Sequence, residues 1–113
     1  MIMTTNTIRV VKGHGDTVVE RFRVSKGIHK FEGFVRMQVL KTMDLEEYDE
    51  IRVCTTWESM ENFQSWVNSD SFHAAHAKRQ EQQASNENSI ILGSQLTCYE
   101  IPVEHLPETV EMK

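Results

Sequence analysis

The stretch YDEIRVCTTWESMENFQSWV, residues 48–67, decides the fold of this chain. Its first half, Tyr48 to Trp57, is rich in Ile, Val, Thr and Cys, which is typical of a strand. Ser59 then supplies a hydroxyl that can cap a helix over Met60 to Val67. The residues that share one face of this helix are Phe63, Trp66 and Val67. The sequence therefore predicts a strand that leads directly into an amphipathic helix.

Further strands extend this unit in both directions. Apolar residues alternate with polar ones, or gather between turn residues, in three more segments. These segments are Thr5 to Val11, Gly33 to Thr42 and Ile90 to Ile101. The acidic stretch at residues 44–47 predicts a turn, so the second and third strands are expected to form a hairpin.

Two more helices complete the order of elements. Asp16 is expected to cap a short helix that runs to about Val24 and turns Val18, Val19 and Phe22 inward. Ser69 or Asp70 is expected to begin a third helix, which carries His76. The order strand, helix, strand, strand, helix pair, strand predicts an α+β fold of the ferredoxin-like split β-α-β type. Its sheet is expected to be antiparallel, with the helices on one face.

The other face of such a sheet stays uncovered. The strands are rich in Val, Ile, Met and Cys, so we expect this face to be too apolar to remain in water. Two copies packed face to face would cover it, which predicts a homodimer. We expect the domain to span residues 1–101, followed by a loosely held acidic tail at 102–113.

Length and charge exclude several classes of protein. The chain has 113 residues and a formal net charge of -5, which opposes attraction to nucleic acid and to anionic membranes. Neither a membrane span nor a signal peptide is apparent in the sequence. Cys54 and Cys98 lie in apolar strand segments without zinc spacing, so both are expected to be reduced core thiols. The cytoplasm is the expected location.

Three residues stand out as carriers of chemistry: Asn6, Trp66 and His76. On a helix, His76 lies beside the apolar stripe of Phe72 and could ligate a metal or a haem iron, although a hydrogen-bonded core histidine fits the spacing as well. Trp66 could equally be a core residue, and Asn6 could cap a backbone group. Hydrolase and nucleotide-binding motifs are missing from the sequence. Spacing alone therefore predicts a dimeric α+β domain with a possible pocket.

A longer set of motifs carries a resemblance. The strings NTIRVVKG from residue 6, VERF from 19, FEGF from 31, WES from 57 and WVNSDSFHAAH from 66 resemble the Isd-type haem-degrading monooxygenases. These enzymes belong to the antibiotic biosynthesis monooxygenase superfamily. The resemblance covers residues 1–101, and its most specific part is the block from Trp66 to His76.

The resemblance implies a cytoplasmic homodimer whose sheets form a dimeric α+β barrel, with one haem per subunit as both cofactor and substrate. It implies that His76 is the axial ligand of the haem iron and that Asn6 faces the distal side of that iron. Trp66 would force the tetrapyrrole out of plane, and Phe22 matches a position that lies against the haem. These roles suit an imidazole, an amide donor and a bulky indole.

The implied reaction is an oxidative opening of the porphyrin at a meso carbon, with O2 and electrons from an external reductase, that releases iron for nutrition. Two alternatives remain open. One is a haem-free monooxygenase of the same superfamily that acts on a small aromatic substrate. The other is a haem-binding carrier or sensor without catalysis. Addition of haemin and a reductant would separate the three.

Overall fold

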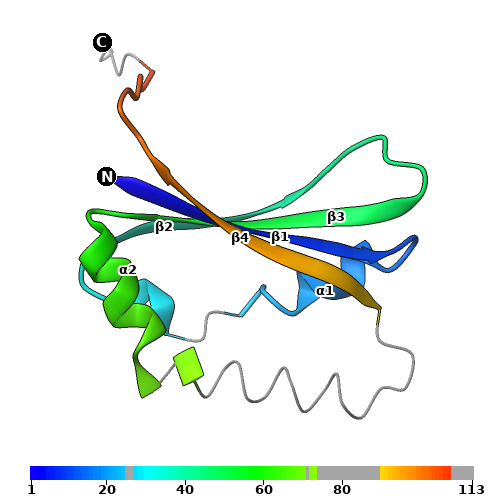
Figure 1. Cartoon of the computed structure of the whole chain (residues 1–113), viewed down its shortest axis with the longest axis horizontal. Coiled ribbons are helices and arrows are strands. Elements are labelled where there is room, and N and C mark those ends of the chain that lie inside the picture. The colour runs from blue at the N-terminus through cyan, green and yellow to red at the C-terminus, as the bar shows by residue number, and fades with distance from the viewer. Residues whose placement is uncertain (25–26, 71, 74–89, 108–113) are drawn as a thin grey trace.

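A four-stranded antiparallel sheet forms the body of the chain (Figure 1). The structure is a computed structural model that describes residues 1–24, 27–70, 72–73 and 90–107. The strands are β1 (Ile2–Val11), β2 (Phe34–Lys41), β3 (Tyr48–Trp57) and β4 (Ile91–Glu100), in the order β2-β3-β1-β4. This order and the antiparallel pairing confirm the ferredoxin-like α+β fold. The hairpin expected between β2 and β3 is confirmed as well.

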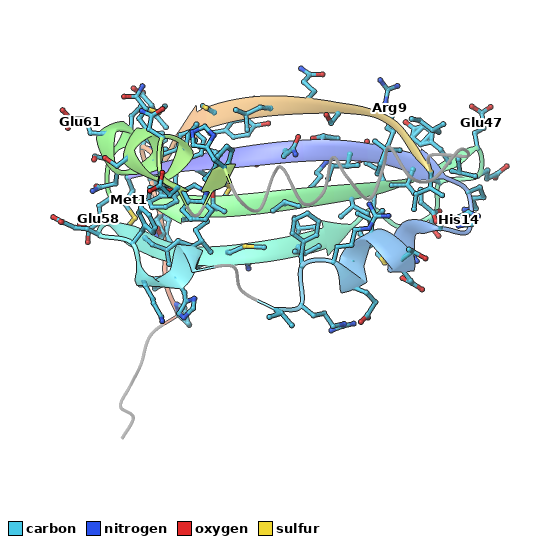
Figure 2. All side chains as sticks on the ribbon, turned by 90° about the horizontal axis from the view of Figure 1, so that it is seen from below. Met1, Arg9, His14, Glu47, Glu58 and Glu61 are labelled. Atoms are coloured by element: carbon cyan, nitrogen blue, oxygen red, sulfur yellow. The ribbon has the colours of Figure 1, made fainter. Side chains whose placement is uncertain are left out.

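The described helices lie on one face of the sheet, as expected (Figure 1). They are α1 (Gly15–Glu20), the 3-10 helix η1 (Ile28–Lys30) and α2 (Met60–Val67). Seen from below, α1 and α2 lie near opposite ends of the strands (Figure 2). We call the face that these helices cover the helix side, and the opposite face the open side.

The start of α2 agrees with the sequence prediction, whereas that of α1 does not. Ser59 caps α2, because its Oγ accepts a hydrogen bond of 3.2 Å from the amide of Asn62. In α1 the capping residue is His14, without a side-chain hydrogen bond, and Asp16 lies inside the helix. The Asp16 carboxylate instead pairs with Lys41 at 3.1 Å. The predicted cap at Asp16 is therefore wrong, and α1 ends at Glu20 rather than near Val24.

Two hydrophobic clusters pack on the helix side. The aliphatic cluster consists of Ile8, Val10, Val18 and Ile51, with Phe22 among the half-buried residues around it. The aromatic cluster consists of Ile28, Trp57 and Trp66, with Phe31, Phe34, Phe63 and Phe72 among its half-buried neighbours. Since Val18 belongs to α1 and Trp66 to α2, each cluster joins one helix to the sheet.

The open side is polar, contrary to the sequence prediction. Thr7, Arg9, Glu50 and Arg52 are among the side chains that line a shallow groove there. The buried apolar residues, among them Ile8, Val10 and Ile51, point to the helix side instead, because side chains alternate between the two faces along a strand.

Both cysteines are free, but only Cys54 is buried. Cys98 is exposed, so its prediction as a core thiol is wrong. Its strand, β4, lies at the edge of the sheet and has a neighbour on one side only.

In the described part of the chain, no helix is long and apolar enough to cross a membrane.

Candidate functional site

Asn6 lies on the helix side of β1, between the two clusters. Along β1, side chains at even positions share this face: Ile2 touches the aromatic cluster, while Ile8 and Val10 belong to the aliphatic one. Asn6 is half-buried and pairs across the sheet with Val53 of β3 and Leu96 of β4. Its carboxamide has no hydrogen-bond partner among the described residues. An amide in this position is a candidate hydrogen-bond donor to a ligand on the helix side.

A buried chain of hydroxyls lies next to Asn6 on the same face. The Oγ1 atoms of Thr4 and Thr55 are 2.5 Å apart, and Nε1 of Trp57 donates to Thr55 Oγ1 at 3.0 Å. Thr4 and Thr55 are 3% and 7% exposed. The indole of Trp57 is therefore held by a hydrogen bond as well as by packing.

Trp66 belongs to the last turn of α2 and is 8% exposed. Two rings meet its indole edge to face. The Phe31 ring lies 4.9 Å away between centroids at 78°, and the Phe72 ring lies 5.6 Å away at 84°. Unlike Trp57, Trp66 has no hydrogen-bond partner for its Nε1 among the described residues. The neighbouring rings therefore define its orientation.

Phe22 follows α1 and continues its last turn, since its amide donates to the carbonyl of Val19 at 3.0 Å. Its ring packs against the aliphatic cluster, as the sequence predicted. Phe22, Asn6 and Trp66 thus all lie on the helix side, with Phe22 in contact with one cluster, Trp66 in the other, and Asn6 between them.

The chain begins a new helical turn after α2, as expected. Ser69 Oγ accepts from the amide of Phe72 at 3.1 Å and donates to the carbonyl of Trp66 at 2.6 Å. The amide of His73 donates to the Ser69 carbonyl at 3.1 Å. His76 itself lies outside the described residues, so its predicted role stays a prediction.

The sequence analysis missed Asp49, which holds the turn between β1 and α1. Its Oδ2 accepts hydrogen bonds from the amides of Gly13 at 3.0 Å and Gly15 at 2.9 Å. These two bonds, together with the ammonium group of Lys12 at 3.5 Å, hold the pKa of Asp49 below its usual value against the effect of burial. A Cβ at Gly15 would approach the same oxygen to 2.9 Å, so a larger residue there would displace the Asp49 carboxylate. The sequence signal for this role is a carboxylate in β3 at a position that shares the helix side with the core residue Ile51.

The open side carries a charged network of its own. Glu50 accepts from the hydroxyl of Thr42 at 2.7 Å and pairs with Arg52 at 3.3 Å, which lowers the pKa of Glu50. Arg9 lies over the Tyr48 ring at 6.0 Å. The described residues include no group of three or more His, Cys, Asp or Glu side chains that could hold a metal ion.

Comparison with known proteins identifies the family of this chain. Residues 1–78 match the family model described as antibiotic biosynthesis monooxygenase. The chain belongs to the antibiotic biosynthesis monooxygenase family.

Among its relatives, the haem-degrading monooxygenase of Halalkalibacterium halodurans is 34% identical over 109 residues, which are 96% of this chain and 89% of that protein. The haem-degrading monooxygenase of Bacillus thuringiensis is 32% identical over 107 residues, 95% of each chain. The similarity therefore includes β4 as well as the residues that the family model matches.

Solved structures agree with this similarity. The haem degrader MhuD from Mycobacterium tuberculosis, solved with two haems in its active site, has a TM-score of 0.64 and 29% identity over 93% of this chain and 99% of that one. An antibiotic biosynthesis monooxygenase structure from Bacillus cereus has a TM-score of 0.78 and 26% identity over 94% and 97% of the two chains.

Proposed function

We propose that this protein is a haem-degrading monooxygenase that opens the porphyrin ring at a meso carbon and releases iron for nutrition. The observation that carries the proposal is the similarity, over nearly the whole chain, to relatives named as haem-degrading monooxygenases. The reaction consumes O2 and electrons from an external reductase.

The helix side fits a flat, largely apolar macrocycle. The aromatic rings of Phe22 and Trp66 lie on either side of Asn6 along the sheet. Asn6 is the polar group between them, and its amide has no partner among the described residues. A ligand site needs this combination of apolar walls with few, well-placed polar groups.

Four residues of the chain have separate roles in the proposed reaction. His76 would hold the haem iron through its imidazole, and Asn6 would donate a hydrogen bond from its amide to the ligand. Trp66 would contact the porphyrin from the α2 end and distort it, while Phe22 would cover it from the α1 end. Haem, when bound, supplies the redox-active iron and is also the molecule that is oxidised. The side chains around it position the ring and exclude water.

A homodimer in which two sheets form a barrel completes the proposed assembly. None of the described helices lies on the open side of the sheet, so this side can receive a second copy (Figure 1). The polar character of this side implies a contact made by hydrogen bonds and charge pairs. The proposed location is the cytoplasm, in agreement with two free thiols on opposite faces of the sheet.

The proposed domain spans residues 1–101, with a tail at 102–113. The amide of Ile101 still donates to the carbonyl of Met1 at 3.1 Å, so this residue remains tied to the sheet. Val103 and Leu106 beyond it are 70% and 73% exposed, which supports a boundary at this point.

The test is an absorbance time course of the protein with one equivalent of haemin, followed by ascorbate in the presence of catalase. Loss of the Soret band with release of iron supports haem degradation. A bound but stable Soret band would instead indicate a carrier or sensor. If haemin produces no Soret band of a protein complex, a haem-free monooxygenase is the better assignment.

The His76→Ala variant tests the axial ligand. We expect it to lose the Soret band of ligated haem, because the imidazole that would hold the iron is removed. His73→Ala, three residues earlier in the same segment, is the matched control and should keep the wild-type spectrum. An unchanged spectrum in His76→Ala would exclude His76 as the ligand.

A further inference from the structure

We infer that Phe31 is a positioning residue for the proposed haem-degrading reaction, because it fixes the plane of the Trp66 indole. This inference rests on the proposed function. The two tryptophans of the aromatic cluster show why it is needed. Trp57 is 0% exposed and its Nε1 donates to Thr55 Oγ1, whereas Nε1 of Trp66 has no hydrogen-bond partner among the described residues and its indole is met edge to face by Phe31 and Phe72. Ring contacts must therefore set the orientation of Trp66.

Phe31 makes the shorter of the two ring contacts with Trp66, at 4.9 Å against 5.6 Å for Phe72. An edge-to-face pair favours one relative orientation, since the positive ring edge meets the negative ring face. A branched aliphatic side chain at position 31 would fill space but would not favour that orientation. The contribution of Phe31 is thus directional and goes beyond volume.

The backbone holds Phe31 firmly enough for this role. Its amide donates to Ile28 at 3.1 Å and its carbonyl accepts from Phe34 at 3.1 Å. The amide of Glu58, just before α2, donates to the carbonyl of Gly33 at 2.8 Å. Gly33 has a φ of 83°, and a Cβ there would overlap the carboxamide of Asn62 in α2. The segment that carries Phe31 therefore contacts the first turn of α2 directly.

The helix end that carries Trp66 is fixed as well. The carbonyl of Trp66 accepts from the amide of Ser69 at 3.0 Å and from its hydroxyl at 2.6 Å. With both backbones fixed, the Phe31 ring sets the side-chain plane of Trp66 rather than the position of α2. Loss of the Phe31 ring should change how the indole meets the haem without removing the indole from the site.

The chain supplies a matched control in Phe34. Phe34 belongs to the same cluster, is also half-buried, and meets Trp57 at 5.5 Å and the same angle of 78°. Its removal costs a comparable ring contact, but at the tryptophan that the reaction does not use. Phe31→Leu and Phe34→Leu therefore separate a role in positioning Trp66 from a general loss of packing.

The first measurement is ¹⁹F NMR of haem-free protein labelled with 5-fluorotryptophan. Trp57→Phe and Trp66→Phe assign the two resonances. We expect Phe31→Leu to shift or broaden the Trp66 resonance and Phe34→Leu to do so only for Trp57. A Trp66 resonance that is unchanged in Phe31→Leu would overturn the inference. Phe31→Met, which lacks a ring but is closer to Phe in length, serves if the Leu variant does not fold.

The second measurement separates haem binding from turnover. We expect Phe31→Leu to bind haemin with a Kd within about threefold of wild type, but to degrade it at least fivefold more slowly, while Phe34→Leu keeps the wild-type rate. Equal slowing in both variants would overturn the inference. A wild-type protein that binds haemin without degrading it would overturn the proposed function and this role with it. Normal wild-type turnover with no Phe31 effect would overturn the inference alone.

Discussion

The two ends of the helix side differ in what holds their side chains in place. At the α1 end, Ile8, Val10, Val18 and Ile51 pack as aliphatic groups, which attract one another in no preferred direction. At the α2 end, edge-to-face ring pairs surround Trp57 and Trp66. The first end secures a helix to the sheet, whereas the second also fixes the planes of particular rings.

This difference shows where stability and positioning reside. An aliphatic cluster tolerates small rotations of its members, because its free energy depends on buried area. A ring pair loses part of its attraction when one ring rotates. Substitutions at the α1 end should therefore change the free energy of unfolding most, while those at the α2 end should also change the orientation of the tryptophans.

The largest effect on stability is expected for Ile51→Ala at the α1 end. Ile51 is 0% exposed, so its truncation should lower the free energy of unfolding by about 3 kcal/mol through lost burial and a new cavity. Urea denaturation measures this loss. The native near-UV circular dichroism of the tryptophans should stay unchanged, because they lie at the other end. A loss below about 1 kcal/mol would contradict a tightly packed aliphatic cluster.

Asp49→Asn is expected to have the next largest effect, with a Tm lower by roughly 5 °C at pH 7. The charged acceptor of two amides is lost, and α1 is held less firmly. The pKa of Asp49 is lower in the folded protein than in the unfolded chain. The Asp49 carboxylate therefore stabilises the fold fully at a pH above its unfolded pKa, and this stabilisation is lost as the pH falls through its folded pKa. Thermal scans should show the Tm gap between the two proteins constant from pH 5 to 8, and narrowing below about pH 4.

Asp16→Asn is the matched control for Asp49→Asn. Its carboxylate pairs with Lys41 at 3.1 Å, but the side chain is 84% exposed. An ion pair in water contributes little, so the Tm should change by no more than about 1 °C. Equal losses from the two substitutions would show that general charge, rather than the two amides, accounts for the effect of Asp49.

The smallest effect on stability is expected for Asn6→Ala, between the two ends. Its amide has no partner among the described residues, so the free energy of unfolding should change by no more than about 0.5 kcal/mol. Haem degradation should nevertheless fall at least tenfold, since a distal hydrogen-bond donor is removed. Asn6→Asp, which cannot donate when ionised, should show the same loss of rate in the Soret time course. A rate equal to that of wild type in both variants would remove Asn6 from the site.

Strong local signals made much of the fold predictable. The limits of β3 and α2 agree with the sequence prediction, because a β-branched run and a serine cap leave few alternatives. The sequence was less informative about features that depend on tertiary contacts, such as which face of the sheet is covered. Alternation along a strand separates two faces, but it does not tell which face receives helices, so the open side was wrongly expected to be apolar. Cys98 was mispredicted for a related reason, since its exposure depends on an edge position.

The site was predictable in part. Asn6, Phe22 and Trp66 were selected from motifs, and the structure brings them to one side of the sheet. Neither Phe31, although it belongs to the FEGF motif, nor Asp49 was assigned a role from the sequence, because their partners are far away in the sequence. Phe31 meets a ring 35 positions later, and Asp49 meets amides 34 and 36 positions earlier. Such contacts form only once the sheet has brought these segments together.

The close approach of Gly33 to α2 also has a consequence for local opening of the fold. The Glu58 amide donates to the Gly33 carbonyl, so its hydrogen is protected from solvent exchange only while the segment before β2 stays against α2. A single amide proton at the end of β3 therefore reports on the attachment of a segment some 25 residues earlier. Exchange at Glu58 measures how often the support of Trp66 detaches, even in a molecule whose sheet remains intact.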